Sequence, residues 1–522
     1  MKELIYHRQF LPAINTFGSK PAVIDRNYTA SYEDHGERVL RLASAMRSEL
    51  GLKPSDRFAV MAANCHEYLE LYHAAYLGAG VINPLNLRLA GKELDYIVRD
   101  SGTEVVFVDQ TFAAVFADAM ASSDEPSAIR HVVLIGSGEG PHDLRYEALL
   151  AMGRSEVPAE PEEEDPVVLM YTGGTTGLPK GVVVTQRAEM LNCYHVGIAL
   201  KRFSPREVCL LQTPIFHAAS MVSVLSTTGT GGLQVMLPMF EPGEVLNLIE
   251  RHGVTITTMV PTMIAMMVNH PDFAPERIAT LESLTYGASP MPEPLLDRLL
   301  TMLPKLELNQ GYGMTECSSV LTFNGPEHHR AGDPRLRSVG RPVQGVELSI
   351  QDASGRTLSA GETGEVCAKA GNLMTEYWHK PEATAEAFRG GWYHTGDAGY
   401  LDDAGYLFLV DRVKDMIISG GENVYSVEVE NAIASHAAVE QVAVIGIPHE
   451  VWGEQVHAVV VTAADATVTA DEIIAHARES IAGYKVPKSV EFRAEPLPLS
   501  GAMKVLKRAL RDPYWQDEKR QI

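Results

Sequence analysis

The first part of the chain alternates between two hydrophobic patterns, which predict helices and strands in turn. Residues 32–50 and 66–80 show the three-to-four-residue spacing of apolar side chains that is typical of helices. Residues 57–63, 104–109 and 131–136 are short, nearly continuous apolar runs, as in strands that are buried on both faces. This alternation predicts an α/β fold with a parallel sheet.

The pattern changes several times further along the chain. Residues 156–166, EVPAEPEEEDP, indicate an exposed acidic linker before a second α/β set at about 167–308. From about Ser338, short strands and glycine turns predict a small β-barrel or sandwich. A hairpin, a helix and a compact α+β unit follow. We therefore predict a large N-terminal region, residues 1–412, and a small C-terminal domain, residues 413–522.

Composition narrows the class of protein. The 522 residues, 45% hydrophobic and 21% charged, are typical of a globular chain with more than one core. A formal net charge of −23 argues against a nucleic-acid or anionic-membrane partner, since both need a basic face. The five scattered cysteines form no CxxC pair and are expected to be free thiols. With no apolar run near the ~20 residues of a membrane span, we expect a cytoplasmic protein without a transmembrane segment.

A glycine- and threonine-rich segment, YTGGTTGLPKG at residues 171–181, lies between two predicted strands. It is not a Walker A loop, because Leu178 and Pro179 separate the last glycine from Lys180 and no helix follows. Glycines let successive backbone N–H groups form an anion-binding nest, and the threonines and the lysine add donors and charge. We interpret the segment as a polyphosphate-binding loop rather than a surface turn.

Two other glycine-rich segments have simpler interpretations. Residues 132–150, VVLIGSGEGPHDLRYEALL, approach a dinucleotide fingerprint, but Pro141 replaces the third glycine, which favours an ordinary turn. Residues 417–430, IISGGENVYSVEVE, read by themselves as strand, turn and helix with Ser426 as the N-cap.

Six motifs occur in a fixed order along nearly the whole chain: YTGGTTGLPKG, PIFH, NQGYGMTE, YHTGD, DRVKDMIISGGENVYSVEVE and the lysine in LPLSGAMKVLKRALR. In this order they resemble the adenylate-forming acyl-CoA synthetases, nearest to the fatty-acyl and aryl or feruloyl-type ligases. The resemblance implies an N-terminal region of two α/β subdomains plus a β-barrel, and a mobile C-terminal lid. It implies attack of a carboxylate on ATP to give an acyl-adenylate and pyrophosphate, followed by displacement of AMP by a thiol.

The resemblance also implies roles for individual residues with ATP, Mg²⁺, coenzyme A and a small carboxylic acid. The phosphates would contact Thr172, Gly173, Gly174, Thr175, Thr176 and Lys180, with Thr172 and Glu316 as metal ligands. The rest of the nucleotide would contact Gly287, Gln310, Gly311, Tyr312, Thr315, Asp397 and Arg412. The acid would contact Phe216, His217, Tyr286, Gly287, Ala288, Gly311 and Met314. Coenzyme A would contact Gly420, Gly421, Trp452 and Lys488.

Lys504 would bridge the α-phosphate and the substrate carboxylate as the principal catalytic residue, together with His217, Thr315 and Glu316. Lys414, in the linker after Asp411, would be the hinge. Taken singly, these residues have structural alternatives, such as core packing for Tyr312 and a solvated basic helix for Lys504.

Two residues depart from the family pattern. Gly174 replaces the serine that is usual in the phosphate loop, and Met503 replaces the glycine that is usual before the catalytic lysine. We expect the bulky Met503 side chain to slow closure of the lid or to reshape its closed pose. The acid is expected to be an apolar monocarboxylate. A stand-alone adenylation enzyme that loads a separate carrier protein is the alternative, and a homodimer is left open.

Overall fold

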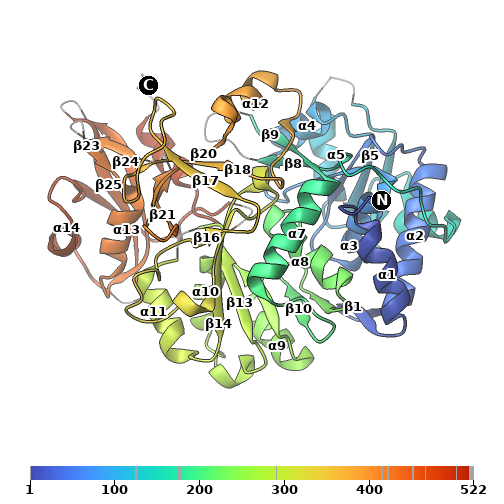
Figure 1. Cartoon of the computed structure of the whole chain (residues 1–522), viewed down its shortest axis with the longest axis horizontal. Helices are drawn as coiled ribbons and strands as arrows, with labels where there is room; N and C mark the ends of the chain where they lie inside the picture. The colour runs from blue at the N-terminus through green and yellow to red at the C-terminus, as the bar shows by residue number, and fades with distance from the viewer. Residues whose placement is uncertain are drawn as a thin grey trace.

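The computed structural model describes the chain except for residues 1, 124–126, 173–177, 290, 413–415, 420–421, 450–451, 465, 501–502 and 516–522. Two large sheets and the helices around them make up the right and lower parts of the molecule in Figure 1. A smaller antiparallel sheet lies at the top centre, and the C-terminal domain, in orange and red, lies at the left. The large N-terminal and small C-terminal parts match the predicted α/β class.

The first sheet has eight strands, and those from β8 to β7 are parallel. In spatial order they are β19 (Glu376–Tyr377), β9 (Lys180–Thr185), β8 (Pro166–Thr172), β4 (Val81–Pro84), β3 (Arg57–Met61), β5 (Val105–Asp109), β6 (His131–Ile135) and β7 (Leu144–Arg145). The predicted strands at 57–63, 104–109 and 131–136 are the adjacent strands β3, β5 and β6, so the predicted parallel sheet is confirmed.

The second sheet has nine strands with a parallel centre. In order they are β16 (Arg341–Pro342), β15 (Thr322–Asn324), β14 (Glu307–Tyr312), β13 (Ser283–Gly287), β12 (Ile256–Met259), β10 (Val208–Leu211), β11 (Leu233–Met236), β1 (Pro21–Asp25) and β2 (Tyr28–Ser31). Several strands do not lie in the sheet that their position in the two predicted α/β sets suggests. β1 and β2 join the second sheet, while β8 and β9 join the first. An apolar pattern shows that a strand is buried, but its neighbours are chosen by tertiary packing.

The third sheet is antiparallel and occupies the region predicted to be β-rich. Its strands are β17 (Glu347–Gln351), β18 (Gly364–Lys369), β20 (Tyr393–Leu401) and β21 (Leu407–Arg412). The fourth sheet belongs to the C-terminal domain and consists of β23 (Glu422–Val424), β22 (Ile417–Ser419), β25 (Gly453–Thr462), β24 (Val439–His449) and β26 (Ser489–Arg493). The predicted boundary at residue 412 stays a prediction.

Helices cover the sheets and fill the space between them. They are α1 (His7–Phe17), α2 (Tyr32–Ser48), α3 (His66–Ala74), α4 (Gly91–Asp100), α5 (Ala113–Ala121), α6 (Tyr146–Met152), α7 (Gln186–Leu200), α8 (Ala218–Gly229), α9 (Pro242–His252), α10 (Pro261–Val268), α11 (Glu293–Met302), α12 (Pro381–Ala387), α13 (Ser426–Ala434), α14 (Ala470–Ser480) and α15 (Lys507–Arg511). Short helical turns are η1 (Ala75–Ala79), η2 (Pro275–Ile278), η3 (Thr315–Cys317), η4 (Pro326–His328), η5 (Arg389–Gly391) and η6 (Asp512–Tyr514).

Local sequence explains where several helices begin. α2 starts after Ser31, whose hydroxyl accepts from the Asp34 backbone while the Asp34 carboxylate accepts from the Ser31 backbone, a reciprocal capping box. The helix predicted at 66–80 is α3 followed by η1, a π-helical turn interrupted by Gly78 at φ 87°. The Ser426 N-cap prediction is wrong by one residue: α13 begins at Ser426, and Tyr425 occupies the N-cap position without a side-chain cap.

One large apolar cluster joins the two main sheets through the helices between them. It combines buried side chains of α2, α3, α7 and α8 with side chains of both sheets. A second cluster lies under α9, α10 and α11, and a third fills the C-terminal domain. All five cysteines are buried and free, as predicted. The search for a membrane-spanning helix, made over the described residues, found none of sufficient length and apolarity.

Candidate active site

The carboxyl ends of β12, β13 and β14 bring several predicted site residues to one edge of the second sheet. Tyr286 pairs with Gln310, and Gly287 pairs with Gly311. The strands approach so closely that a Cβ at Gly287 would lie 2.3 Å from the Gly311 carbonyl oxygen, so only glycine fits there. Ala288 follows with φ 67°, a left-handed backbone that turns the chain away from the edge. Ligands of open α/β sheets bind at such carboxyl edges.

Tyr312, at the end of β14, is linked to Asp397 of the third sheet. Its hydroxyl donates to Asp397 Oδ2 at 2.7 Å. Burial and the neighbouring Asp397 carboxylate raise the pKa of Tyr312, so the phenol keeps its proton and remains a donor. Asp397 is itself held by β20, where it pairs with Arg412 of β21. The predicted adenine and ribose residues are therefore in direct contact.

Tyr377 connects Glu316 to the phosphate loop. Its hydroxyl donates to Glu316 Oε1 at 2.9 Å, and Lys180 Nζ lies 4.7 Å from the centre of its ring. Burial and Glu316 raise the pKa of Tyr377. Lys180 pairs with Thr172 across the β8–β9 hairpin, so Thr172, Lys180 and Glu316 belong to one neighbourhood. Carboxylate and hydroxyl oxygens are the donor set that suits Mg²⁺.

The hairpin that carries the phosphate loop has the predicted strands on both sides. β8 and β9 are antiparallel, and the segment leads directly into a strand rather than a helix. α7 starts immediately after β9, with Thr185 as its N-cap. The loop residues Gly173, Gly174, Thr175 and Thr176 lie outside the described part of the chain, so their predicted phosphate contacts stay predictions.

Two of the predicted acid-binding residues lie at the start of α8, and Tyr286 lies at the end of β13. His217 is the N-cap residue of that helix, and Phe216 is buried beside it, with the two rings 4.6 Å apart. Tyr286 is also buried, and its hydroxyl lies 3.3 Å from Gln310 Oε1 and 3.0 Å from His329 Nε2. Burial lowers the pKa of His329, which favours an uncharged ring at this place.

Met314 and Thr315 complete the turn between the acid and nucleotide residues. Thr315 and Glu316 lie in η3, and Met314 is the residue before it. Tyr393 donates to Met314 Sδ at 3.3 Å, while the Met374 backbone donates to the Glu316 carbonyl at 2.7 Å. The NQGYGMTE motif is thus held by Met374 and by Tyr393 of the YHTGD motif, two residues that were not among the predicted site residues.

Lys504 lies on a short hairpin of the C-terminal domain. Leu499 and Val505 pair as an antiparallel bridge, and Ser500 donates from its backbone to the Lys504 carbonyl at 2.7 Å. Thr262 of α10, the helix that follows β12, donates to the carbonyl of Met503 at 2.7 Å. The lysine hairpin is therefore docked at the same side of the second sheet as Tyr286 and Gln310.

The two described residues of the predicted coenzyme A site lie close together on the C-terminal domain. Lys488 Nζ is 5.6 Å from the centre of the Trp452 ring, and His449 stacks on that ring at 4.3 Å. Trp452 is 40% exposed, so its ring is accessible. Gly420, Gly421 and the predicted hinge Lys414 lie outside the described residues.

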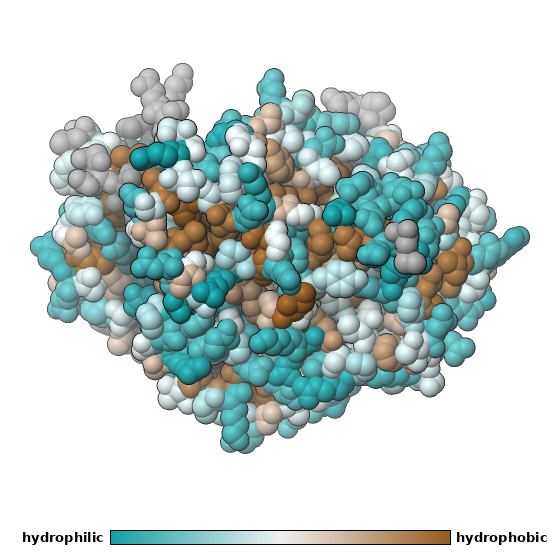
Figure 2. All heavy atoms as spheres, viewed as in Figure 1, coloured by the Kyte–Doolittle hydropathy of each residue, from teal (hydrophilic) through white to brown (hydrophobic). Residues whose placement is uncertain are grey.

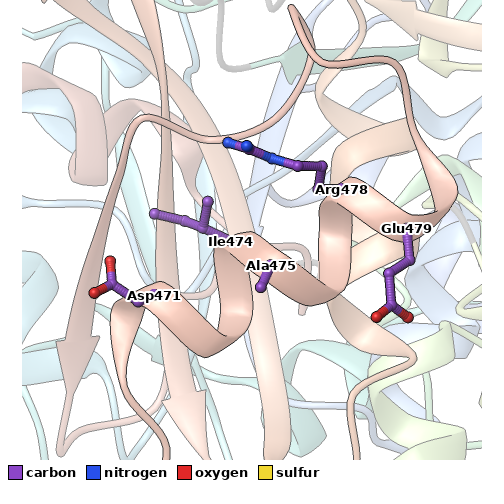
Figure 3. Close-up of a pocket in the computed structure, with 5 residues that line it drawn as sticks. All are labelled: Asp471, Ile474, Ala475, Arg478 and Glu479. Carbon is purple, nitrogen blue, oxygen red and sulfur yellow. The ribbon is translucent and has the colours of Figure 1, made fainter.

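Two surface depressions have no connection with these residues. One of about 340 Å³ is formed by a single helix, α14, whose side chains in Figure 3 point in different directions from the helix. Another of about 260 Å³ lies beside α9 and the ends of β1 and β11. The predicted site instead lies among the sheets. Figure 2 shows hydrophobic residues across the middle of one face of the molecule with hydrophilic residues around them.

Sequence reasoning missed Tyr377, His329 and Thr262. Each acts through a contact with a predicted residue, and none belongs to a glycine-rich or charged motif. Only the acidic and aromatic composition of MTEYW, around Tyr377, gave a weak signal.

Comparisons with known proteins identify the family. The profile of the family described as AMP-binding enzyme matches residues 10–378, and that of the AMP-binding enzyme C-terminal domain matches residues 428–504. The chain belongs to the adenylate-forming acyl-CoA ligase family. The predicted class, an AMP-forming acid–thiol ligase, is confirmed at this level.

Three relatives of this AMP-binding family illustrate its range. A feruloyl-CoA synthase of Amycolatopsis sp. is 38% identical over 92% of this chain and 93% of its own length. A fatty acid–[acyl-carrier-protein] ligase of Streptomyces coeruleorubidus is 33% identical over 99% of this chain and 96% of its own length. The solved Mycobacterium tuberculosis fatty acyl CoA synthetase has a TM-score of 0.76 and 31% identity, and the match covers 98% of both chains.

Proposed function

We propose that the chain is an ATP-dependent carboxylic acid–CoA ligase that acts on an apolar fatty or aryl monocarboxylate. The observation that carries this proposal is the assembly of Tyr312 with Asp397 and of Lys180 with Tyr377 and Glu316, where the carboxyl edge of the second sheet meets the β9–β19 edge of the first. These contacts bring together motifs from separate parts of the chain, and the Lys504 hairpin is docked on α10 of the second sheet.

ATP would lie along this edge. The Asp397 carboxylate would accept from the ribose hydroxyls, and Tyr312 would pack on the adenine with its hydroxyl already turned toward Asp397. The phosphates would meet Lys180, Thr172 and the phosphate loop. Glu316 and Thr172 would hold Mg²⁺, which supplies positive charge next to the phosphate oxygens.

In the first half-reaction, a carboxylate oxygen forms a bond to the α-phosphorus as the bond to the bridging oxygen of pyrophosphate breaks. Two anions have to meet, so catalysis consists mainly of charge neutralisation and alignment. Lys504 would bridge the substrate carboxylate and the α-phosphate. Thr315 would donate to an α-phosphate oxygen, and His217 would border the acyl group.

In the second half-reaction, the sulfur of coenzyme A attacks the acyl carbon and AMP leaves with the bonding electrons, while the thiol proton passes to solvent. Trp452 and Lys488 offer an aromatic face and a positive charge for coenzyme A. Gly420 and Gly421 would line the path of the thiol. Since Lys504 is needed only first, the C-terminal domain would rotate about Lys414 between the two steps.

The acid is proposed to be apolar because of the chemistry of the predicted acid-binding side chains. Phe216, Tyr286 and Met314 offer aromatic and thioether surfaces, and the Tyr286 hydroxyl is already occupied by Gln310 and His329. These groups suit a hydrocarbon or a ring rather than a second carboxylate.

A carrier-protein ligase is the second candidate, because one relative with 33% identity over 99% of this chain has that activity in its name. The two candidates share the first half-reaction and differ in the acceptor. Free coenzyme A and a phosphopantetheinylated carrier protein should be compared as acceptors with the same acid.

The test is a panel of fatty, aryl-propenoic and benzoic acids with ATP and coenzyme A, in which released pyrophosphate and the nucleotide product are measured. We expect AMP and pyrophosphate with at least one apolar acid. ADP and phosphate as products would overturn the proposal, as would pyrophosphate release that no acid stimulates.

A further inference from the structure

The backbone of the lysine hairpin is tightly organised around Ser500. The Met503 backbone donates to the Ser500 carbonyl at 2.9 Å, and the Lys504 backbone donates to the Ser500 hydroxyl at 3.2 Å. With the Leu499–Val505 bridge, these bonds make the hairpin one unit. Whatever holds Met503 and Ser500 therefore also sets the position of Lys504.

Both N-terminal sheets supply contacts to this unit. Arg88, in the segment between β4 and α4, donates from Nη1 to the Ser500 carbonyl at 3.1 Å and from Nη2 to Met503 Sδ at 3.3 Å. Thr262, on α10 of the second sheet, donates to the Met503 carbonyl at 2.7 Å. Two residues that are more than two hundred positions away in the sequence therefore bind the hairpin from two sides.

Met503 has a backbone conformation that an ordinary residue avoids. Its φ is 59°, in the left-handed region that glycine adopts freely and that crowds the Cβ of other residues. A methionine at this position therefore carries a conformational cost that a glycine would not. The Met503 side chain makes two stabilising contacts that act against this cost. It is partly buried against the apolar cluster of the second sheet, and its sulfur accepts a hydrogen bond from Arg88.

We propose that Arg88, Thr262 and Met503 form a clamp that positions Lys504 for adenylation and delays release of the hairpin. This inference rests on the proposed function, because it assumes that Lys504 serves the first half-reaction. The three residues are positioning residues, since they touch the hairpin rather than the reacting atoms.

The clamp acts on the balance between two poses of the C-terminal domain. Its contacts exist only while the hairpin is docked, so they stabilise that pose and no other. Weakening them lowers the fraction of enzyme with Lys504 in place and leaves the second half-reaction unhindered. A Met503 that merely obstructs closure would have the opposite effect on adenylation.

The Met503→Gly variant separates these two hypotheses. Glycine relieves the left-handed backbone and removes both the packing and the sulfur. The clamp predicts slower adenylation, by about three- to tenfold for the loss of the contact to Arg88 and the buried side chain. Faster adenylation in this variant would overturn the clamp and support obstruction.

Arg88→Gln and Thr262→Val test the contacts made by Arg88 and by Thr262 separately. Each should slow single-turnover pyrophosphate release about three- to tenfold, the range expected for one interdomain hydrogen bond. Thioester formation from supplied acyl-adenylate should keep its rate. Thr262→Ser retains the hydroxyl and Arg356→Gln removes an exposed arginine in the turn between β17 and β18, so both should behave as wild type. Equal losses in both half-reactions would contradict a positioning role.

A double variant, Arg88→Gln with Met503→Leu, tests whether the two residues act together. Leucine keeps the apolar volume and loses the sulfur acceptor. If the guanidinium–sulfur contact is part of the clamp, the double variant should be less impaired than the product of the two single effects. If the effects of the two single substitutions simply multiply in the double variant, Met503 Sδ is not part of the clamp.

Hydrogen exchange of residues 496–507 in the ligand-free enzyme gives a readout that needs no substrate. Arg88→Gln and Thr262→Val should raise exchange in this segment, and Arg356→Gln should not. Unchanged exchange overturns the clamp. Raised exchange in an enzyme that releases no pyrophosphate with any acid would instead overturn the proposed function and leave the docking intact.

Discussion

The nucleotide side of the site and the lysine hairpin are built in different ways. Tyr312, Asp397, Tyr377 and Glu316 come from the N-terminal sheets, and two buried phenols donate to two carboxylates there. The hairpin that carries Lys504 comes from another domain and accepts three hydrogen bonds from Arg88 and Thr262, at Ser500 and Met503. The first group is pre-organised by cores that form on folding, while in the proposed mechanism the second contact is made and broken. If that mechanism holds, the buried contacts stay fixed during the reaction and the small polar contact moves.

Replacing Lys504 should produce the largest effect, and the effect should differ between the two half-reactions. Lys504→Ala removes the charge that would face the α-phosphate, and we expect adenylation to lose on the order of ~3 kcal/mol of transition-state stabilisation. Thioester formation from supplied acyl-adenylate should be largely spared, because the nucleotide side is intact. Single-turnover assays of each half-reaction measure this. Comparable losses in both would mean that the lysine is not specific to the first step.

Tyr377→Phe removes one hydrogen bond of the pre-organised group without removing a charge. The Glu316 carboxylate loses its hydroxyl donor, and we expect adenylation to weaken by about 1.5 kcal/mol, as for a hydrogen bond to a charged group. The Mg²⁺ concentration for half-maximal pyrophosphate release should rise, because Glu316 would be less well oriented.

Tyr146→Phe is the matched control for that experiment. The Tyr146 hydroxyl also donates to a carboxylate, Glu70 Oε2 of α3, at 2.7 Å, and that carboxylate accepts from Arg38 of α2 rather than from a predicted site residue. If Tyr377→Phe leaves the Mg²⁺ dependence as unchanged as this control does, Tyr377 has no part in the metal site.

The smallest effect concerns a buried acid in the pre-organised region. Glu189 of α7 is fully buried, and burial raises its pKa to about 8. Between the ordinary carboxyl pKa and pH 8 the folded chain holds a proton that the unfolded chain has lost, so stability falls as pH rises through this window and levels off above it. Glu189→Gln should remove this dependence and stabilise the fold by about 1 kcal/mol at pH 8.5 relative to wild type.

Thermal unfolding at pH 5 and pH 8.5 measures that change, with the exposed Glu164→Gln as the control. A melting temperature of Glu189→Gln that falls with pH as steeply as that of wild type would show that Glu189 is not the source of the dependence. Adenylation should be unaffected at pH 7, which separates stability from positioning.

Local patterns in the sequence were enough to identify several helices and strands and, through the ordered motifs, the family. Apolar runs identified β3, β5 and β6, and the glycine–threonine segment was placed correctly between β8 and β9, because these features depend on residues close together in the chain. The same patterns did not decide which sheet each strand joins: β8 and β9, predicted as part of the second α/β set, belong to the first sheet, and β1 and β2, for which no prediction was made, belong to the second.

Tertiary structure alone decided the partners of the site residues. The donation from Tyr377 to Glu316 spans 61 positions, and that from Arg88 to Met503 spans 415. No periodicity or motif encodes such pairs, since each requires two sheets or two domains to pack in one particular way. Met503 shows the difference most clearly: in sequence it is a bulky replacement of glycine that is expected to slow closure or reshape the closed pose, and in the folded chain its sulfur and carbonyl accept hydrogen bonds from Arg88 and Thr262. Spacing along the chain reports chemistry and local geometry, whereas contacts between distant segments arise from the burial of surfaces that no local pattern describes.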